Sequence, residues 1–159
     1  LSGDLDGIAT DAWTQRQVER HRGDSLKDLA DAWEKDSEQF LTVLPMIPKA
    51  AMTQLVFDVA SHEHDVRHAV GQPGARDSLS VKVGVSFMKH AADSRGDIDV
   101  SRMDQWTASL FDVFRSVGGR RSTEQMVADG IDVELIEKLL RPMPSAFPIL
   151  GFFQGSTCA

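Results

Sequence analysis

The chain has 159 residues, with 24 acidic and 17 basic side chains, a net charge of -7 and one cysteine. This length fits one domain, or one domain with a small appendage, and the negative charge argues against a surface that coats nucleic acid. The longest apolar stretch, residues 147–153, is far shorter than the roughly 20 residues that cross a bilayer. No basic and apolar leader opens the chain, and the lone Cys158 excludes an intrachain disulfide. We therefore expect a cytoplasmic protein without membrane or nucleic-acid partners.

The first predicted helix covers residues 12–22 and ends at Gly23. A second helix is predicted to begin at Ser25, because Asp28 follows three residues later as in a capping box, with Asp in place of the usual Glu. Its core-facing stripe is formed by Leu26, Leu29, Ala30, Trp33, Ser37, Phe40 and Leu41. We expect this stripe to pack against other helices.

A third helix is predicted over residues 49–70, after a proline-containing break at residues 44–48. Its apolar side is formed by Met52, Leu55, Val59, Val66 and Val70. The same spacing places His62 toward the core and Asp58 at the edge of the stripe.

The second half of the chain is also predicted to be helical. Residues 80–92 alternate like a strand and repeat like a helix, and the length of the pattern favours a helix. A further helix is predicted over residues 106–117. Ser122, followed by Gln125, forms a second capping box, and Asp132 caps a last helix over residues 133–140.

The sum of these elements predicts an all-α fold, an antiparallel helix bundle with short loops. The prolines after residue 141 exclude a long helix in the tail. Bundles of this kind build metal sites from inward side chains on facing helices.

Asp58 and His62 are the candidate metal ligands, because they lie one turn apart on one face of the predicted helix. A carboxylate and an imidazole at positions i and i+4 can bind one divalent ion. A catalytic zinc needs three protein ligands, so the alternative is a hydrogen-bonded Asp–His pair at the edge of the core.

His64 and His68 form a rival pair with the same spacing. His62 and His64 are about 200° apart around a helix, so the three histidines cannot reach one ion. We expect His64 and His68 to be exposed beside Glu63 and Asp65.

Three segments carry a family resemblance: WTQRQV with Arg22 and Gly23, DVASHEHDVRHAVGQPGARDS at residues 58–78, and LFDVFR with GRRS and Gln125. Together they resemble the mycothiol-dependent maleylpyruvate isomerase family, a branch of the DinB-like four-helix metalloproteins. The resemblance implies a divalent metal, usually zinc, held by an acid and a histidine four residues apart. These map onto Asp58 and His62, with Asp in place of the more usual Glu.

The resemblance also implies a third ligand, a histidine on a helix that would precede Trp13 and is not contained in this chain. We divide the chain into a DinB-like bundle at residues 1–95, lacking its first helix, and a reduced C-terminal portion at residues 96–159. The third ligand would then come from residues outside this chain, from a second subunit of a homodimer, or from His21. The flanking Arg20 and Arg22 disfavour a cation at His21.

Arg67 and Arg120 are candidate contacts for a substrate anion. A guanidinium group can hold a carboxylate through two parallel hydrogen bonds, which a diacid of the maleylpyruvate type would require. The alternative is that both arginines form surface salt bridges.

The implied function is a metal-dependent isomerase or S-transferase that acts on a small electrophile with zinc and the thiol mycothiol. In the family, the thiolate adds to the substrate, and either bond rotation and elimination follow or the adduct is the product. Two alternatives stay open: a non-catalytic binding or regulatory bundle that has lost part of its metal site, and a fragment of a larger enzyme or half of an intertwined dimer.

Overall fold

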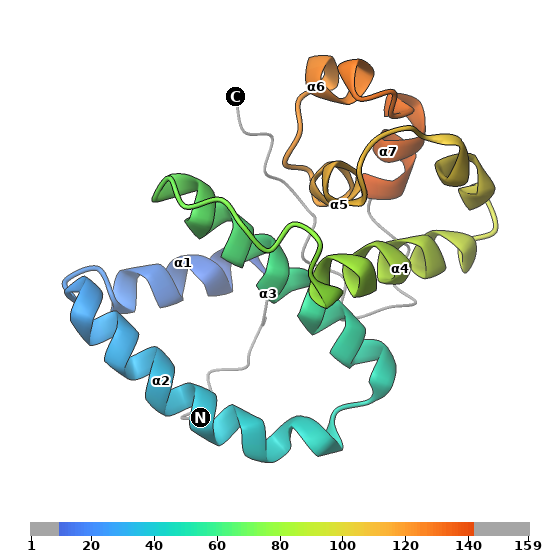
Figure 1. Cartoon of the computed structure of the whole chain (residues 1–159). Helices are drawn as coiled ribbons and strands as arrows, with labels where there is room; N and C mark the ends of the chain where they lie inside the picture. The colour runs from blue at the N-terminus through green and yellow to red at the C-terminus, as the bar shows by residue number, and fades with distance from the viewer. Residues whose placement is uncertain (1–9, 142–159) are drawn as a thin grey trace. The chain divides into compact units, whose positions relative to one another are not determined.

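The computed structural model describes residues 10–141, apart from the side chain of Ala50, and all regular elements in this range are helices (Figure 1). They are α1 (Asp11–Arg20), α2 (Leu26–Val43), η1 (Leu44–Met46), α3 (Lys49–Ala69), α4 (Leu79–Asp93), η2 (Val100–Gln105), α5 (Leu110–Val117), α6 (Thr123–Ala128) and α7 (Val133–Leu140). This confirms the all-α prediction. None of these helices is long and apolar enough to cross a membrane. The predicted loop at residues 1–9, the Pro-rich tail and Cys158 lie outside the described residues.

The chain divides into two compact units, an N-terminal unit described over residues 10–48 and a central unit, Lys49–Arg141. The boundary that the sequence places between residues 95 and 96 lies inside the central unit. It does not separate the structure because α4 packs against both α3 and α5. Arg95 also ties the end of α4 to the end of α7, since its Nη1 donates to the carbonyl oxygen of Lys138 at 3.0 Å.

The N-terminal unit consists of α1, α2 and the short η1. The predicted capping box is confirmed, because the Ser25 side chain accepts from the Asp28 amide and the Asp28 carboxylate accepts from the Ser25 amide. The expected burial of the α2 stripe is not found: no residue of α1 or α2 is buried, and the side chains of Leu26 and Trp33 are 87% and 71% exposed. The amphipathic spacing predicted helix α2 correctly, but no residue of α1 or α2 covers the apolar face of this helix.

The core of the central unit lies where α3, α4, α5 and α7 meet. The rings of Phe57 on α3 and Phe114 on α5 meet edge to face, with their centroids 5.4 Å apart. Val81 on α4 and Leu135 on α7 are almost completely buried in the same unit. Aromatic rings contribute most of the contact area at such helix junctions, so this pair sets how α3 and α5 approach.

Gly84 on α4 makes that approach possible. A Cβ atom at this position would lie 2.6 Å from Cε2 of Phe114 and 3.0 Å from Cδ2 of Phe57. Because both rings are at least 97% buried, neither can move aside into solvent. The two rings therefore occupy the space that a side chain at position 84 would fill.

Helix caps explain where α5, α6 and α7 begin. The predicted capping box of Ser122 and Gln125 and the predicted cap by Asp132 are both confirmed. The predicted start of a helix at residue 106 is wrong. Trp106 ends η2, and α5 begins after Ser109, whose hydroxyl accepts from the Asp112 amide. The Ser109 cap, rather than the hydrophobic pattern, fixes where the helix begins.

The buried face of α3 differs from the one predicted from its apolar residues. Val59, Val66 and Val70 are more than half exposed, while the buried residues are Gln54, Phe57, Ala60, Ser61 and His64. Phe57 determines this rotation, because its ring must reach Phe114 across Gly84. The buried hydroxyl of Ser61 is satisfied by donating to the Phe57 carbonyl oxygen at 2.8 Å.

The contact over Gly84 leads to a stability prediction. Gly84→Ala is expected to lower the free energy of unfolding by about 1–3 kcal/mol, because the added methyl group overpacks the two rings. The matched control is Gly118→Ala, whose Cβ would meet its nearest neighbour at 3.4 Å, an ordinary contact. Urea unfolding of both variants measures the difference, and equal stability of the two would contradict the packing described here.

Candidate metal and anion site

Asp58 and His62 lie one turn apart on α3, as predicted. His62 Nε2 and Asp58 Oδ1 are 3.6 Å apart, and the two side chains are 65% and 44% exposed. The predicted orientation of His62 toward the core is wrong: it faces solvent, because the ring of Phe57 turns the neighbouring face of α3 inward. The pair is therefore accessible from outside the central unit.

Asp65 stands on the other side of the His62 ring. Its Oδ2 lies 3.9 Å from His62 Nδ1, so the imidazole has a carboxylate near each ring nitrogen. Arg115 Nη1 donates to Asp65 Oδ1 at 2.7 Å, and Arg120 Nε donates to Oδ2 at 3.3 Å. Arg115 lies near the end of α5 and Arg120 lies in the turn that follows it. The two arginines therefore connect Asp65 on α3 with this end of α5.

The charges in this cluster shift two pKa values in opposite directions. The adjacent Asp58 carboxylate raises the pKa of His62 above its usual 6.5, against the effects of partial burial and of Arg120. Partial burial alone would raise the pKa of Asp65, but Arg115 and Arg120 outweigh it and hold that pKa below its usual 3.8. Asp65 is therefore ionised at neutral pH, and His62 favours its protonated form more than a free histidine does.

The Asp58–His62 pair has the separation that two ligands of one ion require. Two atoms that each lie about 2.1 Å from a zinc ion at a tetrahedral angle are about 3.4 Å apart. The observed 3.6 Å fits this value and is long for a direct hydrogen bond. Asp65 Oδ2 lies 3.9 Å from the other ring nitrogen, beyond hydrogen-bond distance, and adds negative charge beside the imidazole.

The described part of the chain does not complete such a site. Among residues 10–141, no group of three or more His, Cys, Asp or Glu side chains is arranged to hold a metal ion. His21, the substitute ligand considered from the sequence, is paired with Asp24, with Nδ1 and Oδ2 2.7 Å apart. Two protein ligands thus fit an ion, and a third is not supplied within these residues.

His64 is the main correction to the sequence-based prediction. It was expected to be exposed, but it is 4% exposed, and its ring lies edge to face against Phe111 and Phe114 at centroid distances of 4.7 and 5.9 Å. Its Nε2 is buried and has no hydrogen-bond partner. Burial lowers the pKa of His64, so the neutral form is favoured in the folded chain. His68 is exposed, as predicted.

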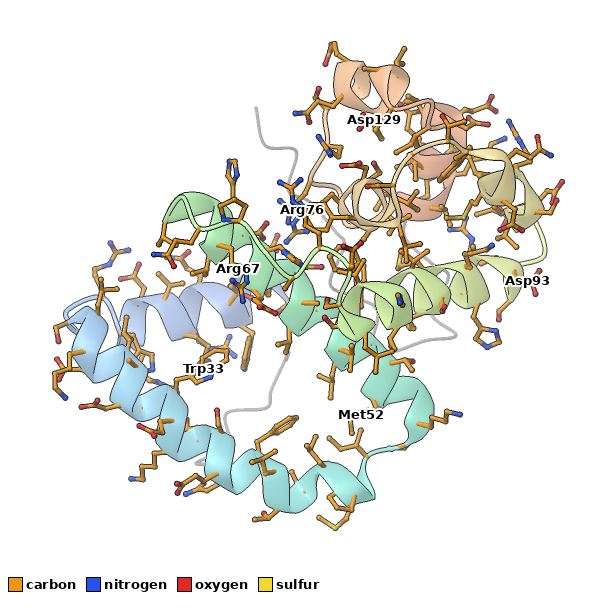
Figure 2. All side chains as sticks on the ribbon, viewed as in Figure 1. Trp33, Met52, Arg67, Arg76, Asp93 and Asp129 are labelled. Atoms are coloured by element: carbon orange, nitrogen blue, oxygen red, sulfur yellow. The ribbon has the colours of Figure 1, made fainter. Side chains whose placement is uncertain are left out.

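The two predicted anion contacts have different surroundings. Arg67, labelled on α3 in Figure 2, is paired with Glu63, with Nε and Oε1 2.8 Å apart. Arg120 belongs to the Asp65 cluster, and its Nη1 also donates to the Gly118 carbonyl oxygen. Both arginines thus form the salt bridges that were the alternative, and Arg120 is the one that lies beside His62.

Asp65 and Arg115 belong to the cluster but were not predicted as site residues from the sequence. Asp65 follows His62 by three residues, a spacing that places both on one helix face and could have identified it. Arg115 is 50 residues away along the chain, and no local pattern connects it with α3.

Comparison of the chain with protein-family models, with curated proteins and with solved structures found no match. The fold class and the geometry of the site are therefore the observations from which a function can be argued.

The two histidines predict opposite responses to pH. The pKa of His64 is lowered in the folded state, so its neutral form contributes stability that is lost as pH falls below about 6.5. The pKa of His62 is raised, so its contribution is present below about 6.5 and is lost as pH rises through the folded value. Unfolding free energies measured between pH 8 and pH 5.5 should fall less steeply toward acid in His64→Leu than in the wild type, and more steeply in His62→Gln. Identical slopes in all three proteins would contradict these assignments.

The carboxylate of Asp65 predicts a second effect on stability. Asp65→Asn leaves Arg115, whose side chain is 14% exposed, without its ionic partner. The expected loss is about 1–3 kcal/mol, less than for a fully buried pair because Asp65 is itself about one-third exposed. Glu134→Gln, which breaks an exposed pair with Lys138 in the same unit, should lower the stability much less in the same urea assay, because solvent screens an exposed pair.

Proposed function

We propose that this chain is a divalent-metal-dependent enzyme that acts on a small electrophile with a thiol co-substrate, as an isomerase or S-transferase. The observation that carries the proposal is the 3.6 Å separation of Asp58 Oδ1 and His62 Nε2 on an exposed helix face. The family resemblance of residues 58–78 supplies the reaction class, and mycothiol is the thiol that it suggests.

Each residue of the cluster then has a role. Asp58 and His62 would hold the ion, for which zinc, iron and manganese all suit an imidazole and a carboxylate. A bound divalent ion lowers the pKa of a coordinated thiol or water, which is the chemistry that such a site supplies. Arg115 and Arg120 would hold the Asp65 carboxylate beside the imidazole, where its negative charge favours a bound cation. The partly exposed Arg120 would add positive charge on the side from which an anionic substrate approaches His62.

A non-catalytic binding or regulatory bundle is the second candidate. It is favoured by one observation, namely that residues 10–141 provide two ligands rather than three. In this case the Asp58–His62 pair is a surface ion pair, and the Asp65 cluster serves only to join α3 to α5.

Metal content decides between these candidates. Protein purified without a histidine tag and dialysed against zinc is expected to carry about one ion per chain, as a single site requires. His62→Ala should carry almost none, because it removes one of two protein ligands. His68→Ala, which removes an exposed histidine from the same helix, should keep the wild-type content.

Cobalt substitution adds a readout that does not depend on turnover. The visible absorption of bound cobalt should be present in the wild type and His68→Ala and absent in His62→Ala. Equal zinc and cobalt content in wild type and His62→Ala would place any bound metal elsewhere and leave the binding bundle as the better candidate.

A further inference from the structure

The N-terminal unit carries an apolar helix face that its own helices leave uncovered. This α2 face consists of Leu26, Leu29, Trp33, Phe40 and Leu41, which are between 37% and 87% exposed (Figure 2 labels Trp33). No residue of α1 or α2 is buried, so these two helices make no core with each other. Fewer than 40 residues without a core do not hold a fold by themselves, and the α2 face therefore needs an occupant.

A second copy of α2 is a poor occupant for this face. The helix carries five acidic side chains and two lysines, which gives it a net charge of -3. Two such helices side by side would bring like charges together along the seam, where paired helices normally place opposite charges. The occupant should instead be apolar and uncharged.

The chain itself contains a segment with this chemistry. Residues 142–159 include no Asp, Glu, Lys, Arg or His, and residues 147–153 read FPILGFF. Fully extended, these seven residues span about 23 Å. The α2 face runs from Leu26 to Leu41, a helix rise of about 22 Å. Length, apolar character and neutrality therefore agree between the segment and the face.

We propose that residues 147–153 dock on the α2 face of the same chain and provide the apolar cover that α1 and α2 lack. Both partners contain aromatic residues: α2 has Trp33 and Phe40, and the segment has Phe147, Phe152 and Phe153. Aromatic pairs add attraction beyond the area that they bury. The exposed valines of α3 are a weaker match for this segment, because they are aliphatic and extend over only about 11 Å, from Val59 to Val66.

The single cysteine allows a direct test, since Cys158 follows Phe153 by five residues. A nitroxide label on Cys158 of the full chain is expected to cause loss of amide signal intensity along α2, relative to the same sample after reduction of the nitroxide. Phe152→Asp should restore the α2 signals, because a charge is placed within the docking segment. Ser156→Asp, which adds the same charge beyond the segment, should leave the intensity loss unchanged, and unaltered central-unit chemical shifts in both variants would show that they are folded.

A mixed sample identifies the source of the segment. Isotope-labelled Cys158→Ser chains combined with spin-labelled chains of natural isotope content report only on contacts between molecules. Undiminished α2 signals in the mixture, together with their loss in the singly labelled chain, support docking within one chain. Loss of α2 signal in the mixture would assign the segment to a second copy and overturn the proposal, as would intensity loss confined to α3, or no loss in either sample.

Discussion

The contact of Phe57 with Phe114 over Gly84 is the constraint on which the arrangement of the central unit depends. Gly84 leaves a gap on α4 that two buried rings fill, one from α3 and one from α5. Once Phe57 points into this gap, the rotation of α3 about its axis is fixed. His64, two turns further along the same face, is then buried against Phe111 and Phe114, and Asp58 and His62 are left on the solvent side.

The same rotation places Asp65 where α5 can reach it. Its carboxylate accepts from Arg115 and Arg120, which come from the end of α5 and the following turn. The polar site and the apolar core are therefore two consequences of one helix orientation. A change that rotates α3 would disturb the pairing of Asp65 and the exposure of His62 together.

The sequence predicted the helices well because their signals are local. Ser25 with Asp28, Ser122 with Gln125, and Asp132 each satisfy backbone amides within four residues, so the caps could be read directly. The burial of α3 could not be predicted in this way. Val59, Val66 and Val70 are more apolar than Gln54, Ser61 and His64, yet the latter are buried. Only the long-range contact between Phe57 and Phe114 decides which face turns inward.

The candidate site could be predicted only in part, because some of its contacts are local in the sequence and others are long-range. Asp58 and His62 are one turn apart on a helix, which is a local relation, and the structure keeps them together. Arg115 reaches Asp65 across 50 residues of chain, and a helical pattern holds no information about such a distance. The metal, the thiol and the substrate remain predictions that depend on the family resemblance.

The division into two units also affects how unfolding of this protein should be followed. Trp13 and Trp33 lie in α1 and α2, whereas Trp106 lies in the central unit at the end of η2. Total tryptophan fluorescence therefore averages over two units, each of which can unfold in its own transition. The total signal then combines two unfolding transitions. A chain in which Trp106 is the one remaining tryptophan would report on the unfolding of the central unit by itself.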